Sequence, residues 1–358
     1  MREFVCPTKI YSGTGSLDAL TQYPAKRALL VTDPYFSTNG TVELLRSLMP
    51  DTVVQVFDHV TPDPSVTSVA EGAAVCRRVQ PDMLIALGGG SAMDCAKGIR
   101  FTADYPMVFV AIPTTSGSGS EVTSYTVLSK DGQKIPLMDA GLRPNAAILD
   151  DRFLQTLPKS LVANAGMDIL AHALEALTAT GRSGFTDALA MHAAQCVLEK
   201  LEESYQGNLE VRMELHEAAA MAGLAFEQAG LGVCHSLAHA MGGAFSLPHG
   251  TLCGMLLPAV LAMNAETSIR QYARLAKQCG MPAATDRLAL RNLLSYMEKL
   301  RRKLQMPDNL RQAGVEPTQW QEKKESILTT ALQDPCCKTN PVVPTRERLE
   351  TIYGTVAP

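Results

Sequence analysis

The sequence lacks the features that mark membrane and nucleic-acid-binding proteins. No stretch approaches the about 18–20 uninterrupted apolar residues of a membrane span, and the N-terminus lacks the apolar core of a signal peptide. No run of five or more basic residues occurs, and 32 Lys and Arg against 36 Asp and Glu give a net charge of −4. We therefore expect a soluble, cytoplasmic protein that binds neither a membrane nor nucleic acid.

The cysteines also lack the spacing of a zinc ribbon or of a disulfide framework. Nine are scattered along the chain, none forms a C-x-x-C pair, and Cys336 and Cys337 are adjacent. An odd number without paired spacing indicates reduced thiols, as in cytosolic proteins.

The composition nevertheless supports two sizeable cores. With 358 residues, the chain is about twice the usual domain length. Hydrophobic residues make up 46% and charged residues 19%, which excludes general disorder. We therefore expect two folded domains.

The periodicity of the apolar residues changes near residue 157. Before it, short and almost continuously apolar runs at residues 28–32, 53–57, 83–87 and 108–112 predict strands buried on both faces. Helical stretches at residues 66–79 and 92–101 lie between them. This alternation predicts an α/β domain over residues 1–157, with a doubly wound parallel sheet.

After this boundary the apolar residues recur with the period of an α-helix. Strand patterns nearly vanish from residues 158–358, which we interpret as an all-helical domain. Its expected helices lie at residues 167–179, 186–203, 212–229, 234–241 and 286–305.

A glycine-rich turn follows the third predicted strand. Gly88-Gly89-Gly90-Ser91 would open the next helix, where a backbone without side chains can approach a pyrophosphate and the helix N-terminus favours an anion. The turn is not the standard G-x-G-x-x-G, and an ordinary strand–helix turn is the alternative. The pattern favours dinucleotide binding.

Two further segments follow predicted strands. Asp33 comes directly after residues 28–32 and could accept hydrogen bonds from an adenosine ribose, or it could be an N-cap or turn aspartate before Pro34. The hydroxyl- and glycine-rich residues 114–120 could wrap a ligand at the carboxyl edge of the sheet, or form a flexible surface turn.

Five potential metal ligands gather in the helical half. Asp168 and His172 are four residues apart on one expected helix, His235 and His239 repeat this spacing, and His249 follows. A lone histidine in apolar surroundings is more often a core residue, but four of the seven histidines fall in these short motifs. Imidazoles with one carboxylate suit zinc or iron and poorly suit calcium or magnesium. The pattern predicts a transition-metal site.

Together the motifs resemble the iron-containing (group III) alcohol dehydrogenases over essentially the whole chain. The matching motifs are residues 88–91 with Asp94 and Lys97, residues 113–123, residues 166–168 with residues 172–175, residues 232–239, residues 248–250, and residues 339–341. Within that family the sequence is most similar to the short-chain-alcohol enzymes of bacterial microcompartments, such as the propanol dehydrogenase subgroup.

The resemblance implies an oxidoreductase that interconverts a short-chain primary alcohol, such as 1-propanol or ethanol, and its aldehyde. It implies NAD(H) as cofactor and one divalent metal, with iron expected and zinc as the alternative, because nitrogen and oxygen ligands generally bind zinc more tightly than Fe(II). It also implies a homodimer or higher homo-oligomer, and association with a bacterial microcompartment.

The resemblance also implies roles for individual residues. The metal ligands would be Asp168, His172, His235 and His249, and His239 would be a catalytic proton relay outside the metal shell. Asp33 would favour NAD over NADP. The other cofactor-binding positions would be Gly88, Gly89, Gly90, Ser91, Asp94, Thr114, Thr115, Ser118, Thr123 and Lys134. Asp63 departs from the family, where Asn is frequent, which puts a cofactor contact at this position in question.

Three alternatives remain open from the sequence. A dehydroquinate-synthase-like lyase would need a pocket rich in Lys and Arg, whereas the stretches around Asp168 and residues 235–249 are apolar. A glycerol-dehydrogenase-like enzyme would share the architecture. In a non-catalytic protein the metal would be structural, with four protein ligands and no open position.

Overall fold

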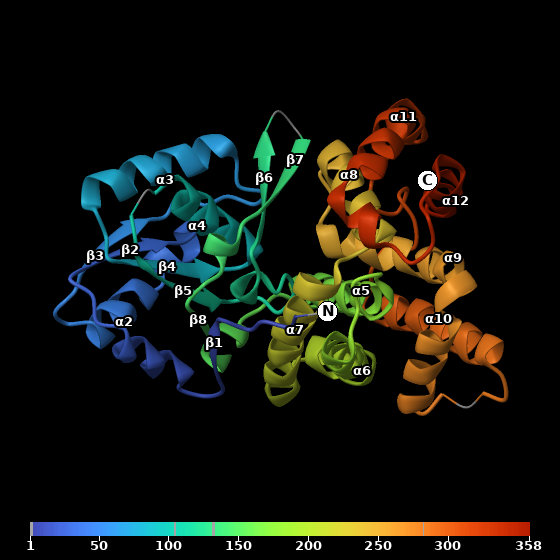
Figure 1. Cartoon of the computed structure of the whole chain (residues 1–358), viewed down its shortest axis with the longest axis horizontal. Helices are drawn as coiled ribbons and strands as arrows, with labels where there is room; N and C mark the ends of the chain where they lie inside the picture. Colours follow the sequence, from blue (N-terminus) through green and yellow to red (C-terminus); the bar gives the residue numbers. More distant parts are fainter. Residues whose placement is uncertain (1–2, 104, 131–132, 282) are drawn as a thin grey trace. The chain divides into compact units, whose positions relative to one another are not determined.

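The computed structural model describes residues 3–103, 105–130, 133–281 and 283–358 (Figure 1). The chain divides into two compact units between Leu157 and Pro158. One unit is Val5–Leu157. The other is Pro158–Pro358 together with the N-terminal end of the chain, where the ring of Phe4 stacks on that of Phe185 at 5.5 Å between centroids.

A parallel sheet forms the centre of the first unit. Within the described residues it has six strands in the order β1-β8-β5-β4-β2-β3, and every pairing is parallel. The strands are β1 (Lys9–Ser12), β2 (Arg27–Val31), β3 (Val53–Phe57), β4 (Met83–Gly88), β5 (Val108–Pro113) and β8 (Ala146–Leu149). This sheet and the helical second unit confirm the predicted fold class.

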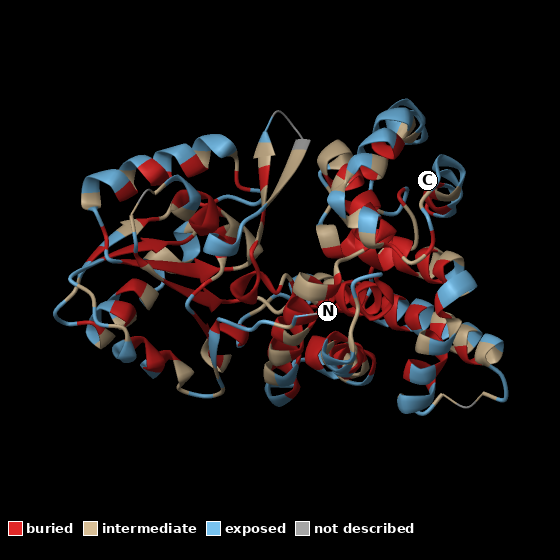
Figure 2. Ribbon diagram, in the orientation of Figure 1, coloured by how far each residue is buried: buried red, intermediate tan, exposed pale blue. Residues whose placement is uncertain are grey.

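Helices cover both faces of the sheet, which explains the continuously apolar strands. On one face, Leu30, Ile85 and Val110 pack against α2 (Thr41–Leu48) and the 3-10 helix η1 (Ser16–Gln22). The other face packs against α3 (Val66–Val79) and α4 (Gly90–Thr102). The burial of the strands is visible in Figure 2.

The order of the strands defines where a ligand should bind. From β2 the chain continues to β3 on one side, and then crosses back to β4 on the other side of β2. In open α/β sheets ligands bind at the carboxyl ends of the strands where the winding direction reverses. This point lies between β2, which is followed by Asp33, and β4, which ends at Gly88.

The strands absent from the sequence prediction are short or polar. β1 is mostly exposed and β8 has only four residues, so neither carries a long apolar run. β6 (Tyr125–Lys130) and β7 (Gln133–Met138) form a separate antiparallel ribbon, in which buried and partly exposed residues alternate along β6.

The second unit consists of α-helices and short 3-10 turns in its described part. Its longer helices are α5 (Lys159–Thr178), α6 (Gly184–Gln206), α7 (Leu209–Ala229), α8 (Val233–Phe245), α9 (His249–Gln278), α10 (Asp286–Lys303), α11 (Pro317–Gln333) and α12 (Arg346–Thr355). α5 packs against α6, α7 and α9, and α9 packs in turn against α8, α10 and α12. All five helices predicted in this half are present; four are longer than predicted, whereas α10 ends two residues earlier than expected.

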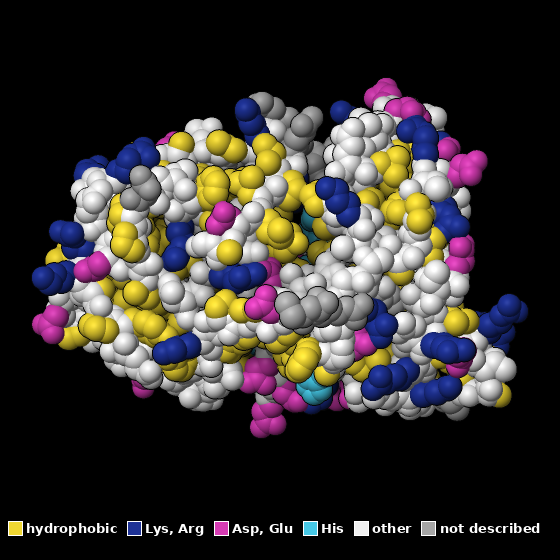
Figure 3. All heavy atoms as spheres, viewed as in Figure 1, with side chains coloured by type: hydrophobic (Ala, Val, Ile, Leu, Met, Phe, Trp, Pro, Cys, Tyr) yellow, Lys and Arg dark blue, Asp and Glu magenta, His cyan; other side chains and the backbone are white. Residues whose placement is uncertain are grey.

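The longest helix, α9, was missed by the sequence pattern because Pro258 lies inside it and its backbone departs from helical geometry at Ser268. By length and composition alone α9 could cross a membrane. Its first turns are buried, with Leu252, Leu256 and Leu257 fully covered, as in the core helix of a globular domain. On the face shown in Figure 3, Lys and Arg side chains are scattered among Asp and Glu.

Candidate active site

The glycine turn after β4 opens a helix and packs closely against the loop after β5. α4 begins at Gly90, and no described side chain caps it. A Cβ on Gly89 would lie 3.1 Å from Thr115 Oγ1, and one on Gly90 would lie 3.2 Å from Ser118 Cβ. The glycines therefore allow residues 88–90 to face the loop after β5 closely, and the N–H groups of the first turn are suited to a phosphate.

Asp33 lies at the same edge of the sheet. Its Oδ1 accepts hydrogen bonds from the backbone N–H groups of Tyr35 and Phe36, at 2.9 and 3.2 Å, and so caps α1 (Pro34–Thr38). Its Oδ2 is directed to the glycine turn, because a Cβ built on Gly88 would lie 3.8 Å from this atom. The helix cap and the ribose acceptor are thus compatible, since each uses a different oxygen.

The loop after β5 is anchored by a buried lysine. Lys97 on α4 donates to Ser120 Oγ at 2.8 Å, to Thr123 Oγ1 at 3.2 Å and to the carbonyl oxygen of Tyr125 at 2.6 Å. Asp94 accepts from Ser120 Oγ at 3.1 Å, and burial raises the pKa of Asp94 although Lys97 opposes this. Asp94 and Thr123 therefore hold the shape of the loop.

The remaining predicted cofactor positions lie around this edge. The N–H of Thr114 donates to Gly88 O at 2.9 Å, which joins the ends of β5 and β4. Ser91 is in the first turn of α4. Lys134 on β7 forms an ion pair of 2.8 Å with Asp63, so the acid that departs from the family pattern binds a predicted cofactor residue.

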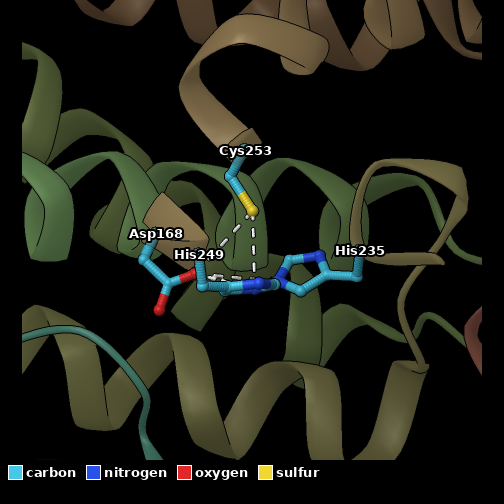
Figure 4. Close-up of side chains that lie close together, drawn as sticks. All are labelled: Asp168, His235, His249 and Cys253. Atoms are coloured by element: carbon cyan, nitrogen blue, oxygen red, sulfur yellow. Dashed lines mark hydrogen bonds and ion pairs between the residues drawn. The ribbon is translucent and has the colours of Figure 1, made fainter. Parts of the chain in front are cut away.

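In the helical unit, three elements bring the predicted metal ligands together. Asp168 and His172 lie on α5, His235 lies on α8, and His249 is the first residue of α9. α9 can approach α5 because residue 250 is glycine: a Cβ there would lie 1.9 Å from the carbonyl oxygen of Asn164. Asp168 Oδ1 is 3.4 Å from His249 Nε2 and 3.9 Å from His235 Nε2 (Figure 4).

A second carboxylate orients His235. Glu175 lies two turns after Asp168 on α5, and its Oε2 is 2.6 Å from His235 Nδ1. Its oxygens also accept the N–H groups of Gly232 and Cys234 at the start of α8, at 2.9 and 2.7 Å. Burial raises the pKa of Glu175 to about 7, although these hydrogen bonds oppose the rise.

With Nδ1 engaged by Glu175, the other ring nitrogen of His235 faces the site. Nε2 is buried and has no hydrogen-bond partner in the described part of the chain. Burial, with the nearby charges of His172 and His239, lowers the pKa of His235 well below its ordinary value. The ring is therefore neutral at pH 7, which is the state in which imidazole binds a metal.

We expect Glu175→Gln to lower metal affinity about 10–100-fold, the range found when a group supporting a ligand is changed. Both carboxylate oxygens of Glu175 accept hydrogen bonds, whereas a glutamine amide has only one oxygen. Its NH₂ group would therefore face an N–H donor that now binds Glu175. Chelator competition would measure the loss. Glu227→Gln, which changes a carboxylate elsewhere in the same unit, is the control, and equal affinity in both variants would contradict the role of Glu175.

His172 and His239 lie beside this centre. The ring of His172 stacks on His235 at 4.4 Å between centroids, and its Nδ1 is 4.0 Å from Asp168 Oδ1. His239 lies one turn after His235 and stacks on His249 at 5.2 Å. Its Nδ1 is 2.9 Å from Oδ2 of Asp334, which caps the 3-10 helix η5 (Pro335–Thr339).

Asp334 holds the ring of His239 from a segment distant in sequence. Burial raises the pKa of Asp334, but the hydrogen bond to His239, the charge of that ring and the N–H of Cys336 outweigh burial and lower it. An ionised Asp334 accepts a hydrogen bond from the Nδ1–H group of His239, which leaves Nε2 as the ring nitrogen that can exchange a proton.

Sequence reasoning gave no role to three residues of this site. Glu175 is the last residue of the motif at residues 172–175. It lies seven residues after Asp168, a spacing that places both on the same helix face. Cys253 lies one turn after His249, and its Sγ is 3.5 Å from His249 Nε2. Asp334 gave no usable signal, because 95 residues separate it from His239.

Comparisons with known proteins match the chain along almost its whole length. A model of iron-containing alcohol dehydrogenases matches residues 7–151, and the C-terminal model of the Fe-containing alcohol dehydrogenase family matches residues 162–357. The chain is 40% identical to 1-propanol dehydrogenase PduQ of Citrobacter freundii, over 96% of each sequence. It is 35% identical to an NADPH-dependent butanol dehydrogenase of Clostridium saccharobutylicum, over 99% of this chain and 98% of that protein.

Solved structures agree with the sequence matches. The iron-containing alcohol dehydrogenase of Thermococcus thioreducens superposes with a TM-score of 0.90 and 31% identity, over 99% of both chains. The chain therefore belongs to the iron-containing alcohol dehydrogenase family and is an alcohol dehydrogenase of this type.

Proposed function

We propose that the enzyme interconverts a short-chain primary alcohol and its aldehyde with NAD(H), and that Asp168, His172, His235 and His249 bind one divalent metal. The observation that carries the metal site is the buried Nε2 of His235, which lacks a hydrogen-bond partner among the described residues and lies 3.9 Å from Asp168 Oδ1. An unpaired buried nitrogen is costly unless a ligand completes its coordination.

The donor set fits a transition metal. One carboxylate with neutral imidazoles suits iron or zinc, and the Glu175–His235 pair is the type of outer carboxylate that fixes a metal-binding ring. Iron is the expectation from the family, with zinc as the alternative.

When bound, the metal would polarise the oxygen of the alcohol or aldehyde, and the hydride chemistry belongs to the nicotinamide. Residues of this chain hold the metal ligands in position and transfer the proton. Glu175 holds the His235 ring, and Asp334 holds His239 so that its Nε2 can exchange a proton with the substrate oxygen or with water.

The preference for NAD over NADP rests on Asp33. Its Oδ2 is directed to Gly88 at the reversal point of the sheet, where it could accept a ribose hydroxyl and would repel a 2′-phosphate. One relative is named an NADPH-dependent butanol dehydrogenase. The cofactor preference of this enzyme therefore has to be measured.

Asp33→Gly should relax the preference for NADH over NADPH. The variant removes the carboxylate charge and also the cap of α1, so Asp33→Asn, which keeps a capping oxygen, is the matched variant. The ratio of kcat/KM for the two cofactors is the measurement. If the unchanged enzyme already uses NADPH as well as NADH, the role given to Asp33 is wrong.

The substrate proposal rests on the relatives, one named for 1-propanol and one for butanol. A panel of primary alcohols and aldehydes with metal-loaded enzyme tests it. We expect 1-propanol and ethanol to be oxidised, and a preference for glycerol or an anionic cyclic substrate would contradict the proposal.

We further propose that the enzyme is a cytoplasmic homo-oligomer that associates with a bacterial microcompartment, on the basis of its similarity to the PduQ enzymes. Co-sedimentation of the enzyme with purified microcompartment shells, followed by an activity assay of the pellet, tests the association. Enzyme that stays entirely in the supernatant would contradict it.

A further inference from the structure

Cys253 places a sulfur atom among the proposed metal ligands. It lies one turn after His249 on α9, and its side chain points to the same centre as those of Asp168, His235 and His249 (Figure 4). One ligand atom from each of these four residues lies within 4.8 Å of the others. His172 is not in this set of four.

Two of the distances within this set are those expected between ligands of one metal ion. Bonds of about 2.0–2.3 Å at tetrahedral angles separate ligand atoms by about 3.3–3.8 Å. The Sγ of Cys253 is 3.5 Å from His249 Nε2 and 3.9 Å from Asp168 Oδ1. Asp168 Oδ1 is in turn 3.4 Å from His249 Nε2.

A second observation points to a ligand at the same place. His235 Nε2 is buried, lacks a hydrogen-bond partner in the described part of the chain, and belongs to this set of four atoms. The thiol of Cys253 therefore does not stand alone: a buried nitrogen that lacks a hydrogen-bond partner lies in the same set. A set of nitrogen, oxygen and sulfur donors around one point prefers a thiophilic metal.

We propose that Cys253 Sγ is a metal ligand in the enzyme without bound alcohol, so that a sulfur atom binds the metal together with the nitrogen and oxygen ligands. This inference rests on the proposed metal site and adds a ligand to it. On binding, the thiol gives its proton to solvent and a metal–sulfur bond forms, so the oxidation states of sulfur and metal are unchanged. A thiolate ligand should shift the preference of the site from Fe(II) to zinc.

Cobalt(II) substitution tests the proposal directly. Thiolate bound to cobalt gives an intense charge-transfer band in the near ultraviolet, which nitrogen and oxygen ligands do not give. We expect this band in the cobalt-loaded enzyme, and its loss in both Cys253→Ala and Cys253→Ser. Cys234→Ala is the matched control: Cys234 is a buried cysteine that contacts the carbonyl oxygen of Cys253 but lies outside the set of four, so the band should persist.

Metal affinity gives a second readout. Cys253→Ala should lower zinc affinity about 10–100-fold in chelator competition, and lower Fe(II) affinity less. Enzyme that binds one cobalt per chain and oxidises alcohol without the band would overturn the sulfur ligand and leave the proposed function intact. Failure to bind cobalt at all would overturn both.

Discussion

Replacing His235 by Ala will remove most of the bound metal and with it the oxidation of alcohol. The Nε2 of His235 is buried at the centre of the proposed ligands, and Glu175 holds the ring in place. Because metal polarisation of the substrate oxygen supplies several kcal/mol to the transition state, we expect turnover to fall about 10³-fold or more. Elemental analysis should fall from one metal per chain to a small fraction. His249→Ala should behave in the same way.

The controls separate ligand loss from unfolding. His192→Ala changes an exposed histidine on α6 and should keep both metal and turnover. His235→Gln offers an alternative if the cavity left by alanine destabilises the buried site. Full metal occupancy in folded His235 and His249 variants would refute the ligand assignment.

The second large effect concerns His239. His239→Ala should keep the metal but lower turnover about 10²–10⁴-fold, the range for loss of a general acid–base group. The ring lies beside His249 and is oriented by Asp334, but it does not belong to the set formed by Asp168, His235, His249 and Cys253. Turnover, metal content and thermal unfolding of the same preparation give the measurement.

A packing role for His239 predicts a different combination of results. The variant would lose stability, and the protein that remains folded would turn over at a nearly normal rate. Asp334→Asn provides an intermediate test, because it retains an oxygen acceptor near His239 Nδ1 but removes the negative charge. A metal-replete His239→Ala enzyme with unchanged rate and pH profile would leave His239 as a packing residue.

The proposed metal site could be inferred from sequence because the spacings of its residues are local. Asp168 and His172 share a face of α5, and His235 and His239 share a face of α8. The approach of α9 to α5 is not local, since it depends on Gly250 fitting against Asn164, and this contact brings Cys253 beside His249. A sequence pattern within one helix cannot predict a contact of this kind between two helices.

The carboxyl edge of the sheet, where we propose that the dinucleotide binds, could be predicted in outline for a similar reason. Continuous apolar runs identify β2, β3, β4 and β5, whereas β1 is mostly exposed and β8 has four residues. From the sequence alone, two roles remained open for Asp33: a helix cap and a hydrogen-bond acceptor for the ribose. In the structure Oδ1 caps α1 and Oδ2 is directed to Gly88, which leaves Oδ2 available for the proposed ribose contact; no propensity or periodicity could have indicated this.

The most direct test of a metal-dependent alcohol dehydrogenase is NADH formation from 1-propanol by one preparation of the enzyme, before and after metal removal. We predict steady NADH formation by the metal-loaded enzyme, loss of activity after chelation, and recovery when Fe(II) or zinc is restored. NADH formation that is unchanged after complete metal removal, or none from any primary alcohol with one metal bound per chain, would contradict the account.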